Sequence, residues 1–366
     1  MCTEETAASF KETMIHSRFS NNLKGEVHMI NYPLLKKGAT IGVTAPSSGL
    51  NAELHNMFKQ CCESMEKKGY QVVCGETVWT QEKAKSASAK KRANEFIGMM
   101  QDENIDIIIP PWGGELLIEI LEEINFEKIN KKWVLGYSDT SVLLLAITLN
   151  TGIATAHGTN LVDLRGEYSD DTTAMWQSVL STKIGASITQ HSSDKYQKEW
   201  KHHDPSPCVY HLTEDTNWKT ISAKNVKIKG RLLGGCIDVI RHLIGTPFGR
   251  VQDFRKKHAD NEPLIWYLEN CELTTVDLRR SLVQMKLAGW FDHCSGILFG
   301  RSAANRPIEN YTVEDVYREL SHELNIPIIY DVDCGHVPPQ ITFINGAFAE
   351  VEVKDNKGVI LQHFKS

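Results

Sequence analysis

Short apolar runs alternate with longer amphipathic runs through the first half of this chain. The short runs near residues 40, 70 and 105 read TIGVTAP, YQVVCG and IDIIIPP, and they are rich in β-branched residues. The longer runs between them, AELHNMFKQCCESMEKKG and SAKKRANEFIGMMQDE, carry apolar residues at helical spacing. Strands and helices in alternation predict an α/β fold with a parallel sheet and helices on its faces.

The chain of 366 residues is long enough for two domains, and four segments are expected. Residues 1–28 are polar and predict either a disordered extension or sequence translated upstream of a start at Met29. Residues 29–165 predict a flavodoxin- or Rossmann-like parallel-sheet domain, and the polar residues 166–223 predict a connector. Residues 224–366 predict a second α/β domain that ends in closing antiparallel strands.

Composition excludes several classes of function. The net charge of -6 gives no electrostatic reason to expect nucleic acid or an anionic membrane as partner. No run approaches the roughly 18 apolar residues of a membrane helix, and no G-x-G-x-x-G follows the first strand, which argues against a nucleotide cofactor. The nine cysteines lack Cys-x-x-Cys spacing, so we expect reduced thiols and a cytoplasmic location. We expect neither a bound metal nor a cofactor.

A glycine pair follows the third predicted strand, at the carboxyl end where open α/β sheets bind ligands. The residues there are Trp112, Gly113, Gly114 and Glu115. Glycines let backbone N–H groups approach a ligand, and a helix N-terminus favours developing negative charge. An ordinary strand-to-helix turn is the alternative interpretation.

Two further residues at strand ends are candidates for catalysis. Glu269 ends the apolar run LIWYLE, and a carboxylate at the edge of a core needs a partner such as a histidine that it orients. His336 lies between Gly335 and a Val-Pro-Pro stretch that would hold its loop stiffly. A lone loop histidine is often merely exposed, but a glutamate and a histidine at strand ends of one domain favour a shared site.

Several motifs now resemble a known family. GATIGVTAPSSG, the glycine pair, WVLGYSDTSVLLLAI, TAHGTNL, GRLLGGCIDVI, LIWYLENCE and CGHVPP occur in the order found in LD-carboxypeptidases, which include the microcin C self-immunity peptidases. The resemblance runs from about residue 32 to the end. It implies a serine peptidase with a Ser-His-Glu triad that cleaves the C-terminal amide of a short peptide or peptide conjugate, such as a muropeptide. Relatives are often dimers, so the resemblance also suggests a homodimer.

The resemblance assigns Glu269 and His336 to the triad but leaves the serine without a match. In the family the serine opens the helix after the glycine pair, and Leu117 or Ile118 falls at that position here. Residues 113–137 contain no serine, threonine or cysteine. The sequence therefore predicts the fold of the family without its nucleophile.

Four other residues are possible substitutes or neighbours. Ser138 is expected to be structural and to cap the following helix. Cys236 and Cys334 are thiols near the motifs, although buried inert cysteines are common. Glu115 is the more attractive substitute, because it could act with His336 as a general base on water, yet its charge would repel an oxyanion.

Two functions remain open from the sequence, a hydrolase and a pseudoenzyme that binds peptides without cutting them. In either case Trp112 would line the pocket, and the N–H groups of Gly114 and Glu115 would hold the carbonyl oxygen. Arg231 and Arg301 are candidate clamps for the substrate carboxylate, because a guanidinium donates two parallel hydrogen bonds.

Overall fold

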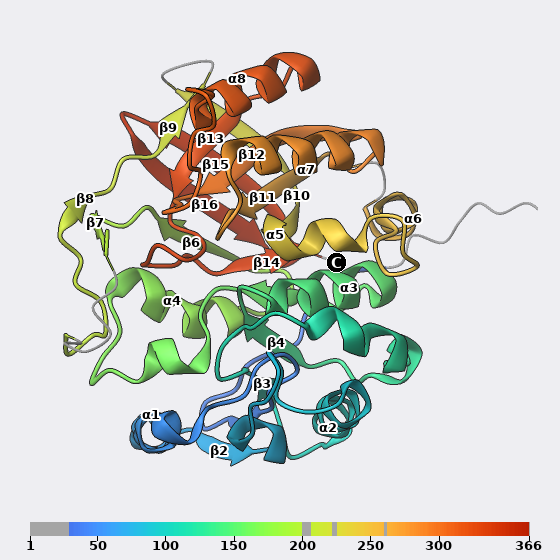
Figure 1. Ribbon diagram of the computed structural model, residues 1–366, viewed down its shortest axis with the longest axis vertical. Coiled ribbons are helices and arrows are strands. Elements are labelled where there is room, and N and C mark those ends of the chain that lie inside the picture. The colour runs from blue at the N-terminus through green and yellow to red at the C-terminus, as the bar shows by residue number, and fades with distance from the viewer. Residues whose placement is uncertain (1–28, 200–205, 222–224, 260–261, 366) are drawn as a thin grey trace, which may run out of the picture.

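The structure is a computed structural model that describes residues 29–199, 206–221, 225–259 and 262–365. The extension predicted for residues 1–28 lies outside the described residues. Figure 1 shows two sheets, with the N-terminal sheet in the lower half and the C-terminal sheet in the upper half. No helix within the described ranges is long and apolar enough to cross a membrane.

The first sheet has six strands in the order β14-β5-β4-β3-β1-β2. Five of these strands are parallel, and the edge strand β14 is antiparallel to its neighbour β5. They are β1 (Thr40–Val43), β2 (Gln71–Cys74), β3 (Ile107–Ile108), β4 (Trp133–Gly136), β5 (Thr155–His157) and the antiparallel β14 (Phe343–Asn345). The helices of this half are α1 (His55–Lys67), α2 (Ala89–Gln101), α3 (Thr140–Thr151) and α4 (Asp171–Leu180).

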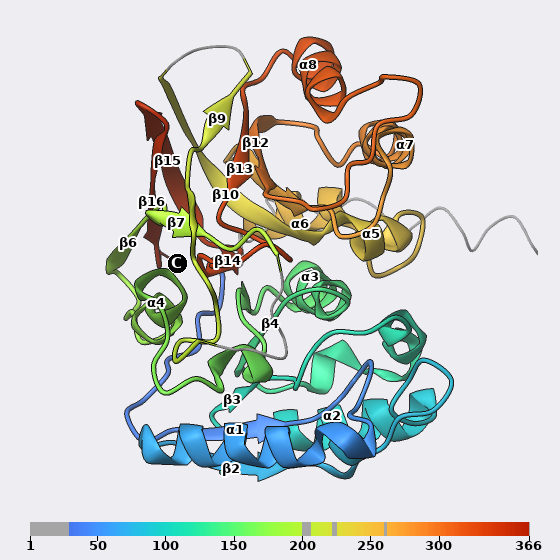
Figure 2. The same cartoon turned by 60° about the vertical axis from the view of Figure 1, so that its left-hand side comes forward.

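The chain reverses its direction across this sheet at β1. It passes from β1 through α1 to β2 on one side, then through α2 to β3 on the other. Because such crossovers are right-handed, α1 and α2 cover opposite faces of the sheet, as Figures 1 and 2 show. The carboxyl ends of β1 and β3 therefore flank a crevice, the usual place for a ligand in an open α/β sheet.

The second sheet has eight strands in the order β6-β16-β15-β10-β11-β12-β13-β9. Its four parallel strands are β10 (Val226–Cys236), β11 (Leu264–Glu269), β12 (Cys294–Gly300) and β13 (Ile328–Val332). Antiparallel strands flank them: β6 (Ser187–His191), β9 (Lys219–Thr220), β15 (Phe348–Lys354) and β16 (Lys357–His363). The remaining elements are the helices α5 (Ile237–Ile240), α6 (Val251–His258), α7 (Thr275–Leu287) and α8 (Val313–Leu324), and a ribbon of β7 (Lys195–Tyr196) with β8 (Glu214–Asp215).

The predicted fold class, α/β with parallel strands and closing antiparallel strands, is confirmed. Two local expectations differ from the structure. The segment after the glycine pair forms a 3₁₀ helix (Leu117–Glu123) instead of an α-helix. The alternating C-terminal run forms the hairpin β15–β16, but its first part, β14, leaves the hairpin and pairs with β5 in the other sheet. The division into domains and connector stays a prediction, and strands β6 and β9 of the expected connector extend the second sheet.

Helix α3 lies between the two sheets (Figures 1 and 2). Its residues from Thr140 to Leu149 are all buried, and a helix that is buried all round needs apolar residues on every side. The sequence TSVLLLAITL meets that need. The helix therefore serves as shared core for both halves.

Asn345 on β14 links the two sheets by hydrogen bonds. Its Oδ1 accepts the backbone N–H of Gly234 at 2.9 Å and the hydroxyl of Tyr267 at 2.8 Å, both from the second sheet. Its Nδ2 donates to Thr155 Oγ1 of β5 at 3.3 Å. All of these groups are buried, so each needs its partner.

We expect Asn345→Leu to destabilise the protein by about 2–4 kcal/mol, because it leaves the buried N–H of Gly234 and the hydroxyl of Tyr267 without an acceptor. Urea unfolding followed by circular dichroism measures the change. Asn104→Ala is the control, since that side chain is exposed and bonds only to nearby Asp102, and it should change stability by less than about 0.5 kcal/mol. Equal effects of the two substitutions would contradict the role of Asn345.

Candidate active site

Three side chains from three strand ends form a hydrogen-bonded chain between the two sheets. Ser138 follows β4, Glu269 ends β11, and His336 lies in the loop after β13. Glu269 Oε2 lies 2.8 Å from His336 Nδ1, and His336 Nε2 lies 3.0 Å from Ser138 Oγ. Carboxylate, imidazole and hydroxyl are thus aligned in the order that a hydrolytic triad requires.

Ser138 occupies a sharp turn between strand β4 and helix α3. Its φ of 63° is in the left-handed region, which a serine rarely adopts and which marks a strained position. A Cβ on Gly136, two residues earlier, would meet Thr140 Cγ2 at 2.9 Å, so only glycine lets the strand and the helix approach this closely. A serine in a tight strand-to-helix turn after G-x is the arrangement of a nucleophile elbow, which presents the hydroxyl to a substrate.

The structure corrects one expectation about hydroxyl groups. The N-cap of α3 is Asp139, and the Ser138 hydroxyl bonds to His336 instead of capping the helix. Leu117 is buried and Ile118 is exposed, and neither offers a nucleophile after the glycine pair. The hydroxyl beside His336 is that of Ser138, from the next strand-to-helix turn along the chain.

The glycine pair packs directly against this turn. A Cβ on Gly113 would lie 2.6 Å from Ser138 Cβ and 2.7 Å from its Oγ. Gly114 has a φ of 144°, and a Cβ there would lie 2.4 Å from the hydroxyl oxygens of Ser47 and Ser48. Both positions require glycine, and the turn lies where it can offer backbone N–H groups next to the serine.

Two buried charged residues hold the glycine turn in place. The carboxylate of Asp139 accepts hydrogen bonds from Ser47 Oγ at 2.5 Å and from the backbone N–H of Leu117 at 2.8 Å. The guanidinium of Arg92 donates to the carbonyl oxygens of Pro46 at 2.8 Å and of Leu116 at 2.9 Å. Together they join the loop after β1 to both flanks of the site.

Sequence reasoning missed both of these residues. Arg92 lies in the run AKKRANE, where it looks like one more exposed base of a helix, yet its side chain is fully buried. In the sequence, Asp139 is typical of an acidic residue at the N-terminus of a helix, where the helix dipole stabilises its charge. The usable signal for the serine was G-x-S between an apolar strand and an apolar helix.

Glu269 and His336 form a strongly coupled pair. The Glu269 side chain is 0% exposed and that of His336 is 25% exposed. Burial disfavours both charged forms, but each partner stabilises the charge of the other, so the pKa of Glu269 lies below its ordinary value and that of His336 lies well above 6.5. The pair therefore orients the ring with Nε2 toward the serine.

Buried aromatic rings complete the surroundings of the imidazole. The ring of Tyr137 meets that of His336 edge to face, with 5.1 Å between centroids. His157 is also close, but burial lowers its pKa to about 4, which keeps it neutral. Its Nδ1 lies 3.8 Å from Cys334 Sγ, and burial raises the pKa of that thiol well above its usual value. Cys334 thus faces a neutral core histidine, and burial keeps it a protonated thiol.

Cys236 is also buried, but it lies at the site. Its Sγ, a carboxylate oxygen of Glu269 and a ring nitrogen of His336 all lie within 4.8 Å of one another. Burial, and next the charge of Glu269, raise the pKa of Cys236 well above its usual value, so it is a protonated thiol and a poor nucleophile. Within the described ranges, these three residues are the set of side chains arranged to hold a metal ion.

The other predicted residues differ in their distance from the site. Trp112 is half-buried, and its indole Nε1 donates to the carbonyl oxygen of Gly49 at 3.1 Å, which fixes the start of the glycine turn. Glu115 is exposed, and burial of part of its surface and the charge of Glu272 raise its pKa. Glu115 was expected to substitute for the serine and to act with His336, but the side chain that contacts His336 Nε2 is Ser138.

The two candidate arginine clamps are both engaged with acids. Arg231 pairs in register with Leu264 at the start of β11, about 16 Å along the strand from Glu269. It is bonded to Glu262 and to the carbonyl oxygen of Gly346, so it does not lie at the site as expected. Arg301, one residue past β12, is paired with Asp333.

Arg301 lines a hollow beside the site, in contrast to Arg231. The hollow has a volume of about 490 Å³ and is also lined by Val337, the neighbour of His336. The guanidinium stacks on the ring of Tyr196 with 4.6 Å to the centroid. Of the two arginines, Arg301 is therefore the one that lies near His336.

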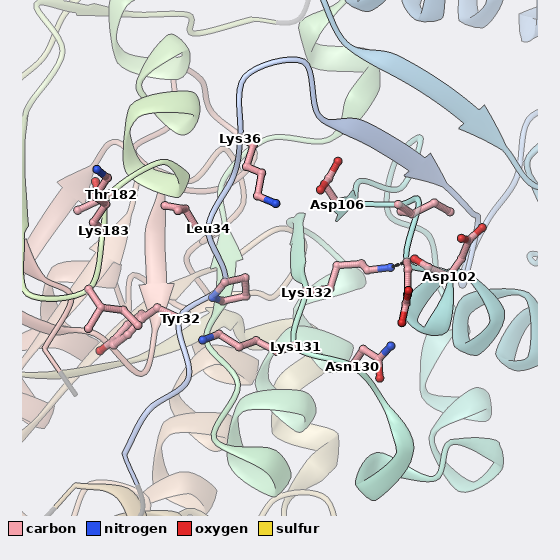
Figure 3. A pocket seen from close by; sticks show the side chains of 14 residues that line it. Tyr32, Leu34, Lys36, Asp102, Asp106, Asn130, Lys131, Lys132, Thr182 and Lys183 are labelled. Atoms are coloured by element: carbon pink, nitrogen blue, oxygen red, sulfur yellow. Dashed lines mark hydrogen bonds between the residues drawn. The ribbon is translucent and has the colours of Figure 1, made fainter.

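A different hollow, of about 510 Å³, lies at the opposite end of the first sheet (Figure 3). Asp106 and Lys132, which precede β3 and β4, line it, together with Tyr32 and Lys36. The Lys132 ammonium is directed toward Asp102, to whose carbonyl oxygen it donates at 2.7 Å. This hollow faces the amino ends of the strands and has no share in the hydrogen-bonded chain.

Comparison with known proteins finds relatives along nearly the whole chain. A putative carboxypeptidase of Vibrio cholerae is 26% identical over 324 residues, covering 86% of this chain and 92% of that protein. The microcin C7 self-immunity protein MccF of Escherichia coli is 25% identical over 359 residues, covering 90% and 96%.

Solved structures show the same fold. MccF in its inactive mutant apo state superposes with a TM-score of 0.76 at 22% identity, covering 92% of this chain and all of that one (100%). The muramoyltetrapeptide carboxypeptidase from Oxalobacter formigenes gives a TM-score of 0.69 at 17% identity, covering 89% and 99%.

Two family profiles match consecutive parts of the chain. The LD-carboxypeptidase N-terminal domain matches residues 41–158, and the LD-carboxypeptidase C-terminal domain matches residues 229–351. The first match includes the turn that carries Ser138, and the second includes Glu269 and His336. The chain belongs to the LD-carboxypeptidase family.

Proposed function

We propose that this protein is a serine carboxypeptidase that hydrolyses the C-terminal amide of a short peptide or peptide conjugate, with Ser138 as its nucleophile. The observation that carries the proposal is the hydrogen-bonded chain from Glu269 through His336 to Ser138. Family membership supports the class of reaction, and the alignment of the three groups supports turnover.

In the proposed mechanism His336 first accepts the hydroxyl proton of Ser138. Ser138 Oγ then bonds to the substrate carbonyl carbon, and the resulting tetrahedral oxyanion receives hydrogen bonds from the backbone N–H groups of Asp139, Gly114 and Glu115. The histidine gives its proton to the leaving amine, which departs and leaves an acyl-serine ester. Water, deprotonated by the same histidine, cleaves the ester and restores the hydroxyl.

Glu269 has two tasks in this scheme. Its carboxylate holds the Nδ1 proton of His336, so that the unprotonated Nε2 faces the serine. It also stabilises the imidazolium that forms when the hydroxyl proton moves. A fully buried carboxylate performs both tasks well, because little water screens its charge.

The proposed substrate is small and carries a free carboxylate. MccF has been solved in complex with glutamyl sulfamoyl guanosine and with aspartyl sulfamoyl adenosine, and a 25% identical relative from Bacillus subtilis is a probable murein peptide carboxypeptidase. Trp112 would line the pocket. Arg301 would attract the carboxylate from the hollow beside His336, although its pairing with Asp333 weakens that attraction.

The alternative, a pseudoenzyme that binds peptides without cutting them, was based on a missing serine. The contact of the Ser138 hydroxyl with His336 weakens that ground and favours a hydrolase, and the retained Glu269 and His336 support the same choice. A cytoplasmic location and a homodimer, which the family resemblance implies, are further parts of the proposal. The described cysteines are all free, as a reducing compartment requires.

We expect Ser138→Ala to lower kcat/KM by about 10⁴–10⁶-fold, because it removes the nucleophile while leaving the binding surface. The assay is release of a C-terminal residue from L,D-linked muropeptides and aminoacyl-nucleotide conjugates, followed by mass spectrometry. Glu115→Gln should change kcat/KM by less than about tenfold, because it removes only a charge that repels the oxyanion. The opposite ranking would identify a carboxylate-based hydrolase, and no turnover by wild type on any substrate would identify a pseudoenzyme.

The pKa of His336, which lies well above 6.5, sets the acidic limit of activity. The imidazole must be neutral to accept a proton, so kcat/KM should fall as the pH drops through a value above 6.5. Glu269→Gln removes the stabilising charge and should lower the pKa of His336, as measured by NMR titration with His336→Gln to assign the signal. An unchanged pKa in the Glu269 variant would contradict the coupling.

We expect Gly113→Ala to lower kcat by at least about 10²-fold, since the added Cβ would displace Ser138 from His336. Gly98→Ala on α2 is the matched control. Its Cβ would have no atom within 4 Å, and alanine should stabilise that helix by about 0.5–1 kcal/mol. Steady-state kinetics and thermal unfolding separate the two effects, and full activity of Gly113→Ala would disprove the close contact.

A further inference from the structure

Two thiols lie beside the histidine and glutamate of the proposed triad. Cys236 Sγ is within 4.8 Å of a Glu269 oxygen and of a His336 ring nitrogen. Cys271, two residues after Glu269, interacts through its thiol with the His336 imidazole. The proposed hydrolysis uses neither thiol, so their position calls for a separate explanation.

One carboxylate oxygen of this cluster has no hydrogen-bond partner outside the cluster. Glu269 Oε2 accepts from His336, whereas Oε1 is buried and has only the Cys236 thiol as a neighbouring donor among the described residues. The same thiol lies 3.4 Å from Asp238 Oδ2. Buried polar atoms are usually satisfied, so this oxygen is available to a ligand that enters the cluster. It is the second, independent indication, beside the mutual distances, that the cluster can bind something.

The donor set selects the chemical class of that ligand. Thiolate sulfur, imidazole nitrogen and carboxylate oxygen are the ligands of Zn²⁺ and related thiophilic cations, whereas Mg²⁺ and Ca²⁺ prefer oxygen alone. Ligands around a tetrahedral Zn²⁺ lie about 3.5 Å apart, so donors within 4.8 Å of one another need to move by only about 1 Å to bind it.

Charge and access are also suitable. A deprotonated Cys236 and Glu269 together supply two negative charges, which neutralise a buried divalent cation. His336 is 25% exposed and Cys271 is partly exposed, so the cluster can be reached from solvent on their side. A site needs both a neutralising shell and an entry path.

We propose that Cys236, Glu269 and His336 form an inhibitory site for Zn²⁺ or a similar thiophilic divalent cation. Binding forms a metal–sulfur bond and releases the thiol proton to solvent. Metal binding itself is independent of the proposed peptidase function, while the inhibition rests on it.

Inhibition follows from the two nitrogens of the imidazole. The metal takes the lone pair of Nδ1, which faces Glu269, and so the remaining ring proton resides on Nε2. A protonated Nε2 donates to Ser138 and cannot accept its hydroxyl proton. The metal also removes Glu269 from its place beside the ring, so both steps of the proton transfer are lost.

Binding is tested on the full chain after treatment with EDTA. Titration calorimetry with zinc sulfate should find one ion per chain, and magnesium sulfate should give no heat of binding. Co²⁺ should produce a thiolate-to-cobalt charge-transfer band. Cys236→Ala should weaken zinc binding by at least about tenfold and remove most of that band.

Cys294→Ala is the matched control, because Cys294 lies at the amino end of β12, away from the cluster. It should bind zinc as wild type does. If Cys236→Ala does not fold, Cys236→Ser replaces it, since serine keeps the volume and lacks the sulfur. Equal zinc affinity in wild type and the Cys236 variant, or cobalt binding without the band, would overturn the site.

Activity measurements distinguish failure of the proposed metal site from failure of the proposed peptidase function. Zinc should abolish hydrolysis by wild type, and EDTA should restore it, with weaker inhibition of Cys236→Ala. Stoichiometric zinc binding to an active enzyme without loss of activity would overturn the inhibitory role. If wild type hydrolyses nothing, the proposed function fails, and the calorimetric arm still decides whether the metal site exists.

Discussion

A buried carboxylate needs a partner, and the pairing of Glu269 determines where several other residues must lie. Leaving a buried charge unpaired costs about 3–5 kcal/mol. The partner is His336, which the loop after β13 brings back over the end of β11. The imidazole then contacts Ser138 in the other half of the molecule, so this hydrogen bond joins the two halves in addition to the contacts of α3 and Asn345.

The sequence predicted the elements well, because their hydrophobic periods are clear. It also predicted that Glu269 and His336 share a site, and the two are hydrogen-bonded. The contact of Ser138 with this pair was missed because a resemblance read along the chain placed the serine after the glycine pair, whereas β3 and β4 are parallel neighbours that bring successive turns together. Contact between Gly113 and Ser138 is a property of the sheet, and linear spacing does not reveal it.

The sequence also could not predict which strands pair with one another or which polar side chains are buried. Apolar and polar residues alternate along much of the run from Gln340 to His363, but this alternation does not show which sheet each strand joins. The hydrogen bonds of Asn345 to Gly234 and Tyr267 hold β14 between the sheets. Likewise the sequence around Arg92 suggests an exposed helix residue. Its guanidinium is buried because it donates a hydrogen bond to the carbonyl oxygen of Pro46 in the loop after β1.

The position of β14 has a consequence for synthesis on the ribosome. The first sheet draws five strands from residues before 158, but its sixth comes from residues 343–345, close to the C-terminus. While the chain is being made, β5 is an open edge that later residues must cover. Ser138 and His336 likewise meet only after residues near the C-terminus have been made, so a growing chain lacks the assembled site until synthesis is almost complete.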